Sequence, residues 1–104
     1  MTDITFFKNR DTFFFDSRGH TGYAEGGLDV LCSAVSILCY TLAAALAKYE
    51  EEGKIVNFRK RIASGEVHLE FSAEYLPEGI KTLMLGFGLL NENFPEYITA
   101  DIEL

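Results

Sequence analysis

A long apolar stretch, Val30–Ala47, limits most strongly how this chain can fold. It directly follows Asp29, a residue type that favours the N-cap of a helix, and the apolar pattern continues through Tyr49. Because Ser, Thr and Tyr recur within it, we expect a buried core helix and no membrane contact, although its length alone does not exclude a membrane span. The acidic run Glu50–Glu52 opposes the helix dipole, which predicts a frayed last turn before Gly53.

Length and composition predict one globular domain covering residues 1–104. The chain is 48% hydrophobic, which is enough apolar material for a single core. Two aromatic runs, Phe6-Phe7 and Phe13–Phe15, are typical of strands, and we expect them to be buried. The first residues lack the charged and then apolar pattern of a signal peptide, so we expect a cytoplasmic protein with reduced thiols.

The charge balance narrows the class of partner. Sixteen acidic residues against nine basic ones give a net charge of −7. Such a chain repels the phosphate backbone and attracts basic partners, so we expect no direct nucleic-acid binding.

The residue pattern predicts the element order β-β-α-β-β-α-β. We expect strands at Thr2–Lys8, Asp11–Arg18, Ile55–Ile62, Glu66–Ser72 and Tyr97–Leu104, and a second helix from near Pro77 through Leu90. In the fourth strand, Leu69 and Phe71 alternate toward one face, so His68 points the other way. The fold class is therefore α+β, with an antiparallel or mixed sheet covered by two helices.

A segment rich in glycine contains a histidine and is followed by a cysteine. Four glycines fall within nine residues and predict a mobile loop that contains His20; they are Gly19, Gly22, Gly26 and Gly27. Cys32 falls near the third position of the first helix, where partial positive charge favours a thiolate. In the functional interpretation, Cys32 is a nucleophile and His20 acts as general base and then acid, with nearby main-chain N–H groups for an oxyanion.

A purely structural interpretation fits these residue types equally well. Cys32 and Ser36 are then small residues that allow close helix packing, His20 is an exposed loop residue and Asp29 only caps the helix. Asp29, Cys32, Ser36 and Cys39 nevertheless follow a spacing that aligns them along one helix face.

Cys39 and His68 are expected to be structural or surface residues outside the site. Cys32 and Cys39 would lie about 10 Å apart along a helix, beyond disulfide reach. Two cysteines and two histidines without paired spacing predict no metal and no other cofactor.

The segment around the two candidate catalytic residues resembles the ribosomal-processing cysteine proteases of the Prp family. The resemblance rests on Gly19-His20, Tyr23, Gly27, Asp29, Cys32, Val35 and Ser36, and it extends over the whole chain. It implies that His20 and Cys32 form a catalytic dyad, that Asp29 and Ser36 support it, and that the glycine loop moves for substrate entry. Where the family commonly has alanine, this chain has Thr21, a minor departure.

The resemblance also implies a substrate and an assembly state. Members of the family are small cytoplasmic homodimers that remove a short N-terminal extension from a large-subunit ribosomal protein, the twenty-seventh by conventional naming. The apolar run Leu83–Leu90 is compatible with a dimer interface. Two alternatives stay open: a non-catalytic protein-binding module at the ribosome, and a redox-sensing thiol protein, which would lack a resolving cysteine nearby.

Overall fold

Residues 1–21 and 30–104 are described by the structure, a computed structural model, and they form five strands and two helices. The elements are β1 (Thr2–Asn9), β2 (Thr12–Arg18), α1 (Val30–Glu51), β3 (Val56–Ala63), β4 (Glu66–Ser72), α2 (Glu78–Asn93) and β5 (Ile98–Ile102). The predicted order β-β-α-β-β-α-β is confirmed.

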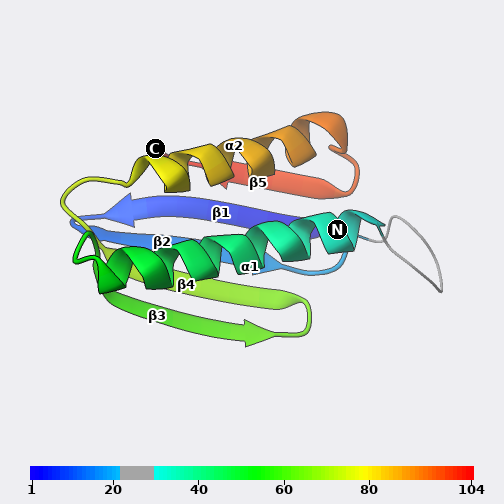
Figure 1. Cartoon of the computed structure of the whole chain (residues 1–104). Helices are drawn as coiled ribbons and strands as arrows, with labels where there is room; N and C mark the ends of the chain where they lie inside the picture. Colours follow the sequence, from blue (N-terminus) through cyan, green and yellow to red (C-terminus); the bar gives the residue numbers. More distant parts are fainter. Residues whose placement is uncertain (22–29) are drawn as a thin grey trace.

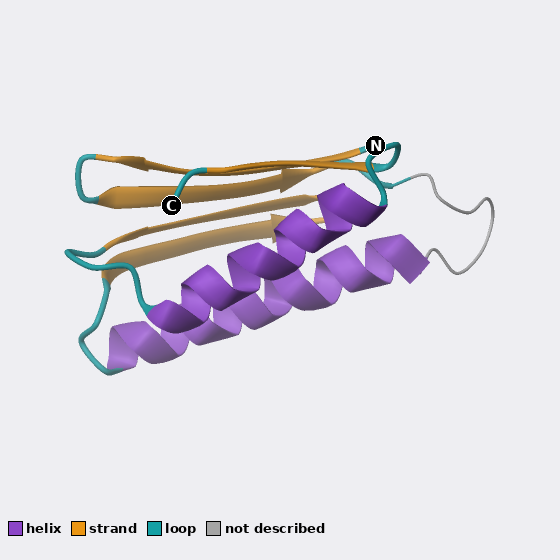
Figure 2. Cartoon of the chain, turned by 90° about the horizontal axis from the view of Figure 1, so that it is seen from above, coloured by secondary structure: helices purple, strands orange, loops and turns teal. Residues whose placement is uncertain are grey.

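The five described strands form one mixed sheet in the order β3-β4-β2-β1-β5 (Figure 1). β1 pairs in parallel with β5, whereas the pairs β1–β2, β2–β4 and β3–β4 are antiparallel. Both helices lie on the same face of this sheet, and no helix of the described residues covers the opposite face (Figure 2). The predicted two-layer α+β architecture is therefore confirmed.

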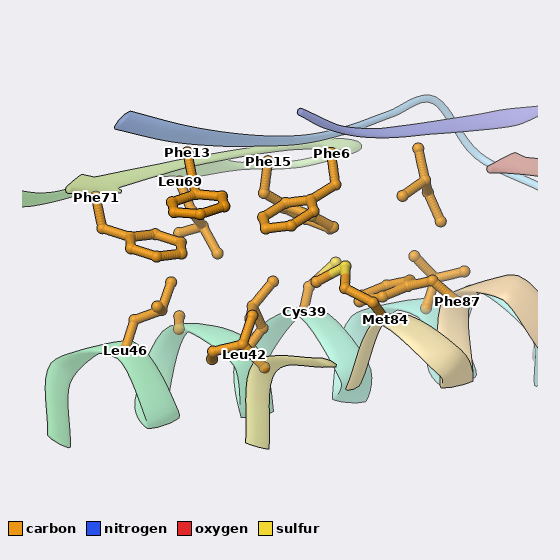
Figure 3. Packing of buried hydrophobic residues seen from close by; sticks show 14 of the residues in the cluster. Phe6, Phe13, Phe15, Cys39, Leu42, Leu46, Leu69, Phe71, Met84 and Phe87 are labelled. Atoms are coloured by element: carbon orange, nitrogen blue, oxygen red, sulfur yellow. The ribbon is translucent and has the colours of Figure 1, made fainter. Parts of the chain in front are cut away.

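The core lies between the sheet and the two helices (Figure 3). From the sheet side, Phe13 and Phe71 stand opposite each other in the β2–β4 register and stack with ring centroids 5.1 Å apart. Across the layers, Phe15 meets Phe87 of α2, with centroids 5.0 Å apart. Alternate residues of each strand face the helices, which is the period of two expected for a sheet covered on one side.

That alternation corrects the prediction that both aromatic runs are entirely buried. Phe6, Phe13 and Phe15 are in the core, but Phe7 is 40% exposed on the uncovered face. Phe14 stands opposite Phe7 in the register and stacks on it at 5.1 Å. Successive residues of a strand point to opposite faces, so an unbroken aromatic run cannot face one core.

Some predicted element ends were also wrong. α1 continues through Glu51, and its last turn is intact, with a Glu50 carboxylate oxygen accepting the main-chain N–H of Phe58 at 2.9 Å. Pro77 precedes α2 as its N-cap instead of lying in its first turn. β5 ends at Ile102, its last partner on β1, and does not reach Leu104.

The helix α1 satisfies the length and composition of a membrane span. Its buried residues face the sheet and the second helix; they are Leu31, Val35, Cys39, Leu42, Ala43 and Leu46. A core helix passes the same composition test, and the buried residues of α1, about a third of its apolar window, belong to the hydrophobic core. The N-terminal end of α1 is thereby held against the sheet, which positions the residues of its first turns.

Candidate active site

Cys32 lies in the first turn of α1, which begins at Val30. Its neighbours Leu31 and Val35 are buried in the core, and Cys32 itself is half-buried. The first turn of a helix has main-chain N–H groups without intrahelical acceptors, and these carry partial positive charge. The core contacts therefore fix a thiol at the end of the helix that favours an anion.

Thr21 contacts the Cys32 sulfur through two of its atoms. Its main-chain N–H donates a hydrogen bond to Sγ at 3.4 Å, and its hydroxyl oxygen lies 3.4 Å from the same sulfur. Thr21 is only 2% exposed. Sequence reasoning missed this contact, because the two residues are eleven positions apart and nothing in the pattern brings them together.

His20 lies over the turn between β3 and β4. A methyl group added at Gly65 would sit 2.7 Å from His20 Nε2, and 3.2 and 3.3 Å from two ring carbons. The two segments are also joined by the main-chain N–H of Gly19, which donates to the Gly65 carbonyl at 2.7 Å. The imidazole is exposed to solvent while one side of it rests on the glycine. Gly65 is thus a second residue of the site that the sequence did not reveal.

A cavity of about 300 Å³ brings the two candidate catalytic residues together. Four parts of the chain surround it: the start of β1, the end of β2 with the residues that follow, one face of α1, and the β3–β4 hairpin. Its lining comprises Thr2, Ser17, Gly19, His20, Cys32, Val35, Ser36, Cys39, Tyr40 and Ile62 to Val67. The cavity is therefore bounded both by the nucleophile candidate and by the base candidate.

The structure places some of the predicted site residues and leaves others undescribed. His20, Cys32, Ser36 and Gly19 all line the cavity. Asp29 and the glycines of the predicted loop, Gly22, Gly26 and Gly27, lie outside the described residues. Cys32, Ser36 and Cys39 do share one face of α1, as their spacing predicted.

The second cysteine differs chemically from the first. Cys39 is 2% exposed, and burial raises the pKa of its thiol to about 11, against the opposing effect of a hydrogen bond from Ser17. Such a thiol is not ionised at neutral pH and is a poor nucleophile. Both cysteines are free thiols, and within residues 1–21 and 30–104 no three His, Cys, Asp or Glu side chains cluster as a metal site would require.

His68 stands on the uncovered face of the sheet and takes no part in the cavity. Its ring nitrogens lie 2.8 Å from an Asp16 carboxylate oxygen and 3.2 Å from one of Glu70. The hydrogen bond to Asp16 is the largest of several effects that raise the pKa of His68 above its usual value, with partial burial opposing them. Its exclusion from the site agrees with the strand alternation.

A comparison with known protein families shows the family of this chain. The family described as cysteine protease Prp matches residues 1–99. The chain belongs to the cysteine protease Prp family. It is therefore a cysteine protease, as the resemblance around His20 and Cys32 implied. No curated protein sequence matches the chain.

Solved structures share the fold of this family member over nearly their whole length. SMU.848 from Streptococcus mutans is 28% identical and aligns with a TM-score of 0.63 over 98% of this chain and 93% of its own. Two structures of the essential ribosomal processing protease Prp from S. aureus cover 99% of this chain and 100% of theirs. The one with a covalently linked product peptide is 17% identical, with a TM-score of 0.72. The one with a substrate peptide is 14% identical, with a TM-score of 0.71.

Proposed function

We propose that the chain removes a short N-terminal extension from the twenty-seventh large-subunit ribosomal protein, with Cys32 as nucleophile and His20 as general base and acid. The observation that carries this proposal is the cavity that both side chains line, although they come from different parts of the fold. The cysteine in the first turn of a helix and the exposed imidazole on the same cavity are the two groups that thiol-dependent acyl transfer needs.

The reaction follows from these two groups. His20 takes the Cys32 proton, and the sulfur attacks the carbonyl carbon of the scissile peptide bond to form an oxyanion. First-turn N–H groups of α1 stabilise that charge. The C–N bond then breaks, the imidazolium protonates the leaving amine, and a thioester remains. Water, deprotonated by His20, cleaves the thioester and releases the N-terminal fragment as a carboxylic acid together with the free thiol.

Supporting roles are assigned by the resemblance to the family. Ser36, on the cavity wall one turn beyond Cys32, and Asp29, directly before α1, are proposed to support the dyad. The segment from Gly19 through Gly27 is proposed to admit the substrate. Each role is tested by replacing the residue with alanine and measuring cleavage against the wild type.

The charge of the chain supports a basic ribosomal substrate. The net charge is −7, and among the described residues the cavity lining includes no Lys or Arg, although its one carboxylate, that of Glu66, lies 3.7 Å from the Arg61 guanidinium. A basic precursor is attracted to such a surface, whereas nucleic acid is repelled. The S. aureus protein is an essential ribosomal processing protease, and its structures hold a substrate peptide and a covalently linked product peptide, which supports the same substrate class here. We propose that the reaction takes place in the cytoplasm, where ribosomes are assembled.

We also propose that the protein is a homodimer. Two leucines one turn apart on α2, Leu85 and Leu89, are 66% and 57% exposed. They border a hollow of about 300 Å³ that also includes Ile102 and Leu104. Exposed leucines grouped in this way are typical of an interface, and a second copy is the partner that the resemblance implies. Sedimentation of the wild type as a dimer, and of Leu85→Arg as a monomer, is the expected result; a wild-type monomer at micromolar concentration contradicts it.

The function is tested by mixing the purified protein with the extended ribosomal precursor and measuring the product masses. We expect one cut by the wild type, none by Cys32→Ala, and the same cut slowed by about 10²- to 10⁴-fold in His20→Ala. The matched control is Cys39→Ala, which removes the other thiol of the same helix and should retain cleavage. Full activity of Cys32→Ala would refute the assignment of the nucleophile, and an uncut precursor with the wild type would refute the assignment of the substrate.

A further inference from the structure

We propose that Thr21 is a positioning residue that stabilises the Cys32 thiolate with two hydrogen bonds, one from its main-chain N–H and one from its hydroxyl. Both donor atoms lie 3.4 Å from Sγ. The catalytic meaning of this contact rests on the proposed function, in which Cys32 is the nucleophile. The contact itself is a property of the folded chain and can be measured without any substrate.

The protonation state of the sulfur decides the direction of the second hydrogen bond. While Cys32 carries its proton, either the thiol or the hydroxyl can be the donor. A thiolate has no proton and only accepts, so the Thr21 hydroxyl, which rotates about its C–O bond, becomes the donor. Hydrogen bonds to an ionised acceptor are stronger than those between neutral groups. The hydroxyl therefore favours the thiolate over the thiol.

Burial of Thr21 shields its contact with the Cys32 sulfur from solvent. Thr21 is 2% exposed, so solvent competes little for its hydroxyl. It is also the residue next to His20, whose ring rests on Gly65. Three consecutive residues thus link the site: Gly19 bonds to the β3–β4 turn, His20 lies over that turn, and Thr21 bonds to the nucleophile. A substitution that keeps the shape of Thr21 leaves this link in place and removes only the hydroxyl.

The test uses Thr21→Val, which replaces the hydroxyl by a methyl group, and Thr21→Ser as the matched control that keeps the hydroxyl. The rate at which iodoacetamide alkylates Cys32 is measured from pH 5 to 10, with peptide mapping to separate it from Cys39. We expect Thr21→Val to react about tenfold more slowly at neutral pH, equivalent to about 1.4 kcal/mol. The pH profile of this variant moves to higher pH. Its rate approaches the wild-type rate at a pH at which Cys32 is ionised in both proteins. Thr21→Ser keeps the wild-type profile.

Two outcomes would overturn the proposal. One is an unchanged pH profile and rate in Thr21→Val; the other is a rate lowered by the same factor at every pH, which would indicate altered packing alone. Thermal unfolding checks that the variant is folded, and if Thr21→Val does not fold, Thr21→Ala removes the hydroxyl with no added bulk. Alkylation needs no peptide, so an uncut precursor with the wild-type protein would refute the proposed function without affecting this result.

Discussion

Replacing Gly65 by alanine should disable catalysis while leaving the fold largely intact. Gly65 has a φ of +71°, and a Cβ atom at this position would lie 2.7 Å from His20 Nε2. Real Cβ atoms essentially never come this close to another heavy atom. The exposed imidazole is free to rotate away into solvent, so the ring is expected to move and the turn to stay. The proposed general base is then lost from the cavity.

Gly53 provides the matched control for the backbone effect. Its φ is +75°, close to that of Gly65, and an added Cβ atom there meets nothing within 4 Å. An L-residue in the left-handed region costs about 1–2 kcal/mol. Each kcal/mol lowers the Tm of a domain of this size by about 4–8 °C. We therefore expect similar decreases in Tm for Gly53→Ala and Gly65→Ala, and a loss of cleavage only for Gly65→Ala.

The size of the expected catalytic loss follows from the role proposed for His20 as general base and acid. A positioned general acid or base contributes about 10²- to 10⁴-fold to the rate, so Gly65→Ala should cleave the precursor at least about 100-fold more slowly than Gly53→Ala. In a His20→Ala background, Gly65→Ala should cause little further loss, because the group that it displaces is already absent. Equal cleavage by the two glycine variants would refute the reasoning. A full additional loss in the His20→Ala background would point instead to blockage of the cavity.

Two further predictions concern the sheet and its core. Because the folded-state pKa of His68 is raised, its contribution to stability is fully present below its unfolded value of 6.5 and is lost as pH rises through the folded value. Urea unfolding of the wild type should therefore show this loss above pH 6.5, Asp16→Asn should reduce it, and an unchanged pH dependence in Asp16→Asn would contradict the assignment. Phe87→Ala, which empties a fully buried position against Phe15, should lower the free energy of unfolding by about 3–5 kcal/mol. The exposed Glu92→Ala on the same helix should change it by no more than about 0.5 kcal/mol, and similar values for the two variants would contradict the packing.

The sequence predicted the element order because local patterns determine it. Alternation in β4 and helical spacing in α2 are properties of neighbouring residues, and β4 was predicted with its observed bounds, Glu66–Ser72. The mistakes have two different origins. The aromatic runs were expected to be buried throughout, although the strand period exposes Phe7. β5 ends where its pairing with β1 ends, at Ile102, and this partner is remote in sequence.

In the candidate site, too, the sequence predicted what neighbouring residues determine and missed the contacts between distant segments. The motif around His20 and Cys32 was sufficient to indicate the family, and Cys32 and Ser36 share the predicted helix face. The contact of Thr21 with the sulfur and that of Gly65 with the imidazole depend on how distant segments pack. Thr21 was treated as a minor departure from the family, because the sequence does not show which atom its hydroxyl meets.

The most direct test of the proposed chemistry is covalent capture of the nucleophile. A peptide that copies the N-terminal extension and ends in a chloromethyl ketone at the scissile position would be attacked by the catalytic sulfur, with loss of chloride and formation of a thioether. Intact-mass measurement followed by peptide mapping should show one peptide on Cys32, with capture strongly slowed in His20→Ala. Modification of Cys39 instead, or equal capture by the wild type and His20→Ala, would contradict the assignment of Cys32 and His20 as the catalytic pair.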